Sequence, residues 1–207
     1  MDTYGVYKTD VMNYAKEAYR RGLMVGTSGN LSACTDDGKI VITPSGIGYE
    51  TITKDDIMVI DFDGNIIEGA HKPSSEWRMH AEIYKNMPEI HGVVHTHSPY
   101  ATAFAVINEP IPVILIEMVM FLRGDVRVAP VASQGTAEVG AGAVIALRGR
   151  GACLLQNHGA VSIGRDLREA YIRTEYTEDA AKICHKAKTI GTPVLVPDDI
   201  IEELLSR

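Results

Sequence analysis

Three tight turns, each flanked by short apolar segments, constrain the fold of this chain more than any other feature of its sequence. They contain Asp37-Gly38, Asp63-Gly64 and Asn157-His158-Gly159. Asn, Asp and Gly are typical of hairpin turns, so each turn predicts two antiparallel strands around it. We expect strands after the turn-rich segment 26–33, at 40–42, 57–62 and 93–97, after 63–65, and twice within 152–163.

Apolar residues with a period near 3.6 predict helices around these strands. The segment 110–120 fits a strand, a helix or both. The expected helices are 9–23, 76–86 with Ser75 as its cap, one beginning at Ser98-Pro99, 136–147, 167–188 and 198–205. Hairpins and flanking helices together favour an α/β fold, in which helices cover a mixed or antiparallel sheet.

The chain of 207 residues contains no linker, repeat or low-complexity tract, so we expect one domain spanning 1–207. Its net charge of −7 argues against a nucleic-acid partner. The longest apolar stretch, 111–122, is too short to cross a membrane. Three cysteines without close pairing, and an N-terminus without a secretory pattern, favour a cytoplasmic protein.

His95 and His97 are candidate metal ligands. Alternate residues of a strand share a face, about 6.6 Å apart at a rise of ~3.3 Å per residue, so both rings can reach one cation. The alternative is an inert pair at a strand end. His158, beside Gly159 in a turn, offers a third imidazole, and three histidines with one open position match a catalytic metal site. The other histidines are expected to be surface or helix-packing residues: His71, His80, His91 and His185.

Glu76 has two interpretations. It can be a favourable charge in the first turn of a helix. It can also be a general base close to a metal, with a pKa that burial raises and a cation lowers. Taken alone, the first interpretation is the stronger one.

Three segments are rich in glycine and hydroxyl residues, which suits phosphate binding. Glycines let backbone N–H groups approach an anion, and a helix N-terminus adds aligned donors. Each segment can equally be an ordinary turn or cap. The segments are Thr27-Ser28-Gly29-Asn30, Thr43-Pro44-Ser45-Gly46 and Ser74-Ser75. The sequence has no P-loop and no convincing dinucleotide-binding motif.

In combination, five motifs resemble the class II aldolase/adducin family, and especially its aldolases that cleave L-fuculose 1-phosphate. The likeness covers nearly the whole chain, and five motifs in order are far more specific than any one of them. The motifs are Gly26-Thr27-Ser28-Gly29-Asn30-Leu31-Ser32, Thr43-Pro44-Ser45-Gly46, Pro73-Ser74-Ser75-Glu76, His95-Thr96-His97 and Gln156-Asn157-His158-Gly159. The resemblance implies a three-layer αβα sandwich with a largely antiparallel central sheet. It also implies a C4 homotetramer with active sites at subunit interfaces.

The resemblance also implies roles for individual residues. His95, His97 and His158 would hold one divalent metal per subunit, zinc first and manganese or cobalt as alternatives. Glu76 would be both a metal ligand and the catalytic acid/base. The substrate phosphate would be bound by Gly29, Asn30, Ser45, Gly46, Ser74 and Ser75.

The implied reaction is cleavage of a ketose 1-phosphate to dihydroxyacetone phosphate and a short aldehyde. A cation chelated by the ketone oxygen and a neighbouring hydroxyl would stabilise the resulting enediolate. Glu76 would then protonate its carbon. L-Fuculose 1-phosphate and a 5-deoxypentulose 1-phosphate are the expected substrates.

The aldehyde end of the site departs from the family pattern. Ile116 stands where these aldolases have a tyrosine from a neighbouring subunit, Gln134 replaces an aromatic residue, and the C-terminal tyrosine is not found. These differences favour an apolar aldehyde such as acetaldehyde.

Three other functions remain open. The first is a ribulose-phosphate 4-epimerase, although such enzymes tend to have aspartate in place of Glu76, and only Glu117 and Asp125 could serve as a second base. The second is a methylthioribulose-1-phosphate dehydratase. The third is a non-catalytic adducin-like module, which ranks low because the metal-site residues are all present.

Overall fold

The computed structural model describes residues 3–206 and is organised around one eight-stranded sheet. The strands are β1 (Asn30–Cys34), β2 (Ile40–Ile42), β3 (Met58–Ile60), β4 (Ile66–Glu68), β5 (Gly92–Thr96), β6 (Arg127–Ala129), β7 (Ala152–Leu155) and β8 (Gly159–Gly164). Their order across the sheet is β4-β3-β2-β1-β5-β8-β7-β6. The middle of the sheet is therefore formed by β1 and β5, which carry residues of the site described below.

The three turns marked by the sequence each join two antiparallel neighbours: β1 with β2, β3 with β4, and β7 with β8. The hairpin predictions are confirmed. β5 also pairs antiparallel with both β1 and β8, whereas β6 runs parallel to β7. The sheet is thus mixed and mostly antiparallel, in agreement with the sequence.

β6 is the strand that the sequence did not predict. Unlike β2, β3 and β4, which are equally short, it adjoins no hairpin turn that would identify it in the sequence. It can pair in parallel with β7 because an intervening helix, α4 (Ala137–Leu147), returns the chain to the same edge of the sheet. Parallel neighbours need such a crossover connection.

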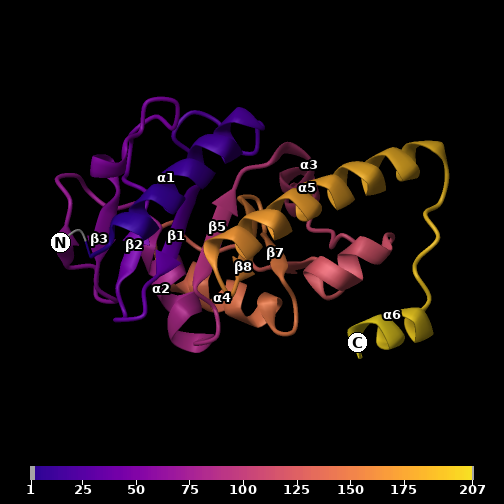
Figure 1. The fold of residues 1–207 in the computed structure, drawn as a ribbon. Coiled ribbons are helices and arrows are strands. Elements are labelled where there is room, and N and C mark those ends of the chain that lie inside the picture. The colour runs from indigo at the N-terminus through magenta and orange to yellow at the C-terminus, as the bar shows by residue number, and fades with distance from the viewer. Residues whose placement is uncertain (1–2, 207) are drawn as a thin grey trace.

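Helices cover both faces of the sheet (Figure 1). Besides α4, the helices of the described chain are α1 (Gly5–Arg20), η1 (Lys54–Asp56), α2 (Trp77–Asn86), α3 (Pro99–Val106), η2 (Met118–Leu122), α5 (Leu167–Ile190) and α6 (Asp198–Leu205). α6 lies away from the sheet and contacts η2 (Figure 1). α2 and α4 share an apolar cluster with one face, and α1, α3 and α5 pack on the other. None of the helices within residues 3–206 is long and apolar enough to cross a bilayer.

β5 shows how the sequence produces this layered packing. All five of its residues are buried. Val93 belongs to the cluster under α2 and α4, and Val94 belongs to the cluster under α1 and α5. Burying a valine side chain contributes roughly 1.5–3 kcal/mol, so a strand that is apolar on both faces favours a position between two helix layers.

Several element boundaries differ from those expected. α1 begins at Gly5 rather than Thr9, because Tyr4 and Tyr7 already pack on the cluster of that face. η2 is a π-helix, which settles part of the ambiguous segment 110–120 as helical. The cap of α2 was assigned wrongly: Glu76, not Ser75, is its N-cap residue, and the helix begins at Trp77.

The pairing of β5 with β8 determines where the candidate site lies. Thr96 is opposite Ala160, and His95 is opposite Val161. Because the two strands are antiparallel, the end of β5 lies beside the turn that precedes β8. Residues 95–97 and the turn at 156–158 therefore meet in space, although about 60 residues separate them in the chain.

Candidate active site

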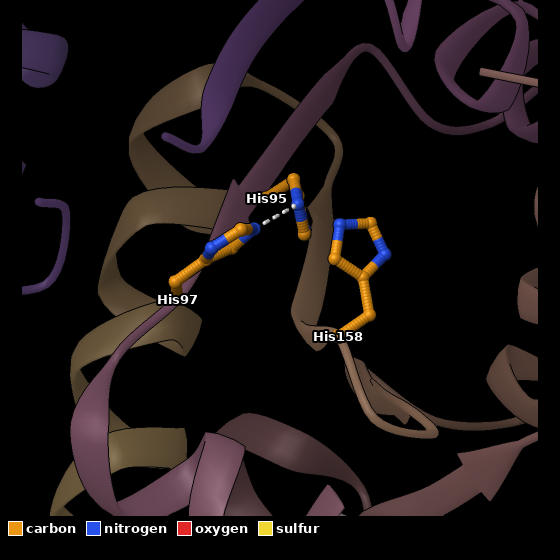
Figure 2. A group of neighbouring side chains, drawn as sticks. All are labelled: His95, His97 and His158. Atoms are coloured by element: carbon orange, nitrogen blue, oxygen red, sulfur yellow. Dashed lines mark hydrogen bonds between the residues drawn. The ribbon is translucent and has the colours of Figure 1, made fainter. Parts of the chain in front are cut away.

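Three histidines from separate parts of the chain meet at the end of β5 (Figure 2). His95 lies in β5, His97 follows the strand, and His158 lies in the β7–β8 turn. One ring nitrogen of each histidine lies within 4.8 Å of the others, and the Nε2 atoms of His95 and His97 are 3.1 Å apart. The predicted convergence of these three side chains is confirmed.

Backbone geometry brings the three rings together. His95 and His97 are two residues apart and leave the same face of the chain. Asn157 has a φ of 56°, a left-handed conformation that Asn tolerates, and it turns the chain so that His158 approaches the pair. Gly159 allows this approach, because a Cβ atom there would lie 2.3 Å from the carbonyl oxygen of Thr96.

Glu76 faces the histidines from the start of α2. Its side chain is buried, with Oε2 3.2 Å from Nε2 of His95 and Oε1 3.3 Å from Nε2 of His158. Despite this proximity, Glu76 Oε1 and His158 Nε2 have no hydrogen-bond partner among the described residues. An unsatisfied buried polar atom costs about 1–3 kcal/mol. A cation between these atoms would satisfy both of them.

The protonation of the histidines suits metal binding. The Nδ1 atom of His95 lies 3.0 Å from the carbonyl oxygen of Ala160, which can only accept, so Nδ1 is the donor of this contact and Nε2 is the nitrogen that faces Glu76. Burial, reinforced by the charges of His95 and His158, lowers the pKa of His97 to about 4. Burial and His95 also lower the pKa of His158, against the opposing effect of Glu76.

Glu76 is ionised at neutral pH. Burial raises the pKa of this carboxyl, but the hydrogen bond and charge of His95, the charge of His158 and the hydrogen bond from Asn30 outweigh it and hold the pKa below its usual range. Three imidazoles and one carboxylate are the donor types that zinc and related divalent ions prefer. The residues therefore fit such an ion.

A cavity of about 240 Å³ opens beside Glu76 and His97. Its wall consists mainly of hydroxyl groups, glycine backbone and amides. It includes every residue that the family resemblance assigned to the phosphate, namely Gly29, Asn30, Ser45, Gly46, Ser74 and Ser75. The structure thus brings three distant segments to one cavity, next to the histidine cluster.

Gly29 holds the first of these segments against β5. Its φ is 84°, and a Cβ atom at this position would lie 2.8 Å from the carbonyl oxygen of His95. Only glycine combines this backbone conformation with so close an approach. The edge of the cavity and the metal-site strand are therefore in direct backbone contact.

The residues that depart from the family pattern lie in different surroundings. Gln134 lines the cavity, whereas Ile116 is half-exposed and does not. Glu117 is also exposed, and Asp125 is paired with Arg150 at 2.7 Å. Neither Glu117 nor Asp125 contributes to the cavity wall that the described part of this chain forms.

His80 is the residue of this site that the sequence did not reveal. It is fully buried, so the surface interpretation is wrong for it, and its ring bridges Ser32 Oγ (Nδ1, 2.6 Å) and Asn30 Oδ1 (Nε2, 2.5 Å). Asn30 in turn donates from Nδ2 to Glu76 Oε2 at 2.8 Å. The spacing of four residues between Glu76, His80 and Tyr84 is the signal that could have shown it, because it aligns them on one helix face.

The remaining histidines agree with the surface or packing interpretation. His71 pairs with Asp56 at 2.9 Å, Nδ1 of His91 lies 3.3 Å from the carbonyl oxygen of Cys34, and His185 is exposed.

Comparison with known proteins gives consistent matches over most of the chain. The family model described as Class II Aldolase and Adducin N-terminal domain matches residues 9–185. A 5-methylthioribulose-1-phosphate/5-deoxyribulose-1-phosphate aldolase of Rhodospirillum rubrum is 37% identical over 197 residues, which cover 95% of this chain and 88% of that protein. A 5-deoxy-D-ribulose 1-phosphate aldolase of Bacillus thuringiensis is 34% identical, covering 97% of this chain and 94% of its own.

A solved structure gives the same result for the fold. An L-fuculose 1-phosphate aldolase is 39% identical and superimposes with a TM-score of 0.92, covering 97% of this chain and 95% of its own. The match extends over the sheet, the helices and the segments that form the site. With five sequence motifs gathered around one cavity and one histidine cluster, the chain belongs to the class II aldolase and adducin family.

Proposed function

We propose that this chain is a metal-dependent aldolase that cleaves a ketose 1-phosphate to dihydroxyacetone phosphate and a short aldehyde. One observation supports the proposal most strongly. The buried carboxylate of Glu76 lies within 3.3 Å of two histidine nitrogens and also lines a cavity rich in hydrogen-bond donors. Such a carboxylate can exchange a proton with a substrate that is held in the cavity.

Phosphate binding is the proposed role of the cavity wall. Gly29, Asn30, Ser45, Gly46, Ser74 and Ser75 supply backbone N–H groups, hydroxyls and one amide from three segments. Donors that converge from several directions fix an anion in position as well as binding it. A fixed phosphate would hold the reacting carbons of the sugar near Glu76, which lowers the entropic part of the barrier.

The proposed ligands of one divalent cation per subunit are His95, His97, His158 and Glu76. Zinc is the first candidate, with manganese and cobalt as alternatives, because imidazole and carboxylate donors suit all three. When bound, the ion supplies Lewis acidity that stabilises negative charge on the ketone oxygen and its neighbouring hydroxyl.

Glu76 is the proposed acid/base. In cleavage, the hydroxyl on the fourth carbon loses its proton to water as it becomes the aldehyde, the bond between the third and fourth carbons breaks, and the electron pair stays on the third carbon. Glu76 takes up a proton from water and delivers it to that carbon. In condensation, the ionised carboxylate removes the same proton, and its low pKa keeps it in the required state at neutral pH. His95, His158 and Asn30 orient the two carboxylate oxygens during this transfer.

The proposed substrate is a 5-deoxypentulose 1-phosphate, and its aldehyde product is acetaldehyde. Two relatives carry names that include 5-deoxyribulose 1-phosphate. The departures at Ile116 and Gln134 also favour an aldehyde with fewer hydroxyls than that of L-fuculose 1-phosphate.

A direct test incubates metal-loaded protein with 5-deoxyribulose 1-phosphate and with L-fuculose 1-phosphate, and measures dihydroxyacetone phosphate. We expect cleavage of both, with a higher kcat/KM for the deoxy sugar. Comparable kcat/KM values for the two sugars would contradict the proposed substrate preference.

An epimer as the product would support the epimerase alternative, and loss of water from methylthioribulose 1-phosphate would support the dehydratase. Protein that binds no metal and forms none of these products would support the adducin-like module.

Three further properties belong to the proposal. A single domain over residues 1–207 is supported by the continuous sheet. A homotetramer with interfacial active sites is supported by exposed apolar side chains such as Met120 and Val131, and light scattering tests it. A cytoplasmic location is supported by free cysteines at 34, 153 and 184.

A further inference from the structure

We propose that His80 is a positioning residue that fixes the side-chain amide of Asn30, so that the N–H groups of that amide face Glu76 and the substrate cavity. The inference deepens the proposed function and rests on it. His80 does not line the cavity and would not touch the substrate. It would act through Asn30, which contacts Glu76 and lines the cavity.

A buried polar stripe connects α2 with β1. Glu76, His80 and Tyr84 are four residues apart and share one face of the helix, while Asn30 and Ser32 alternate onto one face of the strand. All five side chains belong to buried residues. Such a stripe is costly unless its members satisfy one another, and here they form a continuous series of contacts.

The contacts run from Tyr84 to Glu76 without a break. Tyr84 OH lies 2.7 Å from Ser32 Oγ, which lies 2.6 Å from His80 Nδ1. His80 Nε2 lies 2.5 Å from Asn30 Oδ1, and Asn30 Nδ2 lies 2.8 Å from Glu76 Oε2.

The placement of the Asn30 amide decides the direction of the hydrogens between Glu76 and Ser32. Nδ2 of Asn30 donates to Glu76 Oε2, so the carbonyl oxygen of the same amide faces Nε2 of His80. That carbonyl only accepts, so His80 must carry its hydrogen on Nε2. Its Nδ1 atom is then the acceptor for the hydroxyl of Ser32. For a neutral ring, the other tautomer places two acceptors face to face between His80 Nε2 and Asn30 Oδ1.

The burial of His80 supports a single tautomer. Burial, together with the charge of His95, lowers the pKa of His80 to about 3 against the opposing effect of Glu76, so the ring is neutral and has one N–H group. The amide of Asn30 has two ends of nearly equal size, and sterics alone distinguish them poorly. The N–H of His80 stabilises the orientation in which Asn30 donates to Glu76, because it gives the carbonyl oxygen of the amide a donor.

The orientation matters because Asn30 has two N–H groups. One donates to Glu76, and the second remains available to the cavity. Without His80, the amide could turn by 180° and direct its carbonyl oxygen at the carboxylate and toward an anionic substrate. Both the position of Glu76 and the binding of the phosphate would then suffer.

Two substitutions at His80 test the positioning role. H80L removes the N–H group, and H80Q keeps an N–H donor for Asn30 and an acceptor for Ser32. We expect H80L to reduce kcat roughly tenfold or more at unchanged metal content. We expect the kcat of H80Q to lie within about threefold of the wild-type value.

Ile83→Ala is the matched control, because Ile83 is fully buried in the same helix and lies outside the stripe. We expect it to destabilise the fold with kcat within about twofold of wild type. An H80L enzyme as active as I83A would overturn the inference.

A double-mutant cycle separates positioning from general damage. If His80 acts through Asn30, the H80L substitution should reduce kcat far less in an N30A background than in the wild-type chain. If the fold-reductions in kcat of H80L and N30A simply multiply in the double variant, His80 acts independently of Asn30, and the proposal is contradicted.

A nuclear magnetic resonance measurement tests the tautomer without any turnover. In protein labelled with ¹⁵N-histidine, we expect His80 to show a protonated Nε2 and an unprotonated Nδ1 throughout pH 5–9. A hydrogen on Nδ1 would overturn the inference. The two proposals therefore fail separately: inactivity of the wild type on every ketose 1-phosphate would refute the function, whereas an active wild type with the wrong tautomer would refute the role of His80.

Discussion

Glu76 is the residue whose surroundings most constrain its chemistry. It is buried, yet His95, His158 and Asn30 keep it ionised, so the energetic cost of burying a charge is met by specific partners. The same partners leave Oε1 without a hydrogen bond among residues 3–206. A free acceptor next to a cavity is the state that a base needs before it takes a proton.

Replacing Glu76 by glutamine should abolish most of the activity. E76Q preserves the side-chain volume but cannot exchange a proton, so we expect kcat to fall roughly 10²–10⁴-fold, the usual contribution of a general acid/base. Three imidazoles remain, so the purified variant should still contain metal. Glu50→Gln, at an exposed position outside the cavity wall, is the control. A variant E76Q that retains a fifth of wild-type kcat would contradict the proposed role.

At this scale, the sequence predicted residues that stand in recognisable local patterns. His95 and His97 alternate in a strand, and His158 adjoins a turn glycine, so their types and spacing already suggested ligands. His80 could not be assigned in this way, because its partners, Asn30 and Ser32, lie about 50 residues away. Only the packing of α2 on β1 brings them together.

Among the secondary-structure elements, the hairpins were predictable and the parallel edge was not. Hairpin strands are neighbours in sequence, so a turn and two apolar segments suffice to identify them. The pairing of β6 with β7 depends on the crossover through α4, and β6 itself is three residues long. The start of α2 was also misjudged, since a Ser-Ser-Glu segment offers three possible N-caps and tertiary contacts of Glu76 decide between them.

The approach of the Gly29 turn to β5 predicts an effect on stability. In G29A, the free energy of unfolding should fall by roughly 1–2 kcal/mol because alanine disfavours the left-handed φ. It should fall by up to about 3 kcal/mol more because the new Cβ atom clashes with the His95 carbonyl oxygen. Urea unfolding measures this loss. G38A is the matched control, because Gly38 has a φ of 73° but open space around it, and should show the φ effect alone. Equal losses for both variants would argue against the close contact.

At the scale of the whole molecule, the candidate metal site joins segments that lie far apart in sequence. Glu76, His95 and His158 come from a helix N-terminus, the centre of the sheet and a hairpin turn. A ligand that binds all of them only in the folded state must stabilise the fold as a whole.

Metal removal should therefore lower the melting temperature. A cation at 100 times its Kd contributes about 2.7 kcal/mol, which corresponds to a shift of roughly 5–11 °C for a chain of this size. Thermal unfolding with zinc and with a chelator measures it. H158A should lose most of the shift, whereas H185A, at an exposed position, should keep it. A full shift in H158A would contradict the assignment of His158 as a ligand.

The cysteines should be unreactive in the folded chain. Burial, followed by the charges of Asp36 and Asp37, raises the pKa of Cys34 to about 11, and burial raises that of Cys153 to about 12. Because a raised thiol pKa favours the neutral form, a pKa of 11 leaves about one thiolate in a thousand at pH 8. We expect a thiol reagent to label Cys34 at least ~100-fold more slowly in the native chain than in urea. Equal rates would mean that Cys34 is not shielded.

The contact between β5 and β8 has a consequence for how such an enzyme can diversify. The histidine cluster is anchored to the middle of the sheet, whereas Gln134 and most of the cavity wall, apart from Asn30 in β1, belong to loops. Loops tolerate exchange and insertion far better than central strands. Mutation can therefore retune which aldehyde is accepted while the reactive centre is inherited unchanged, and one chemistry can spread over many sugars.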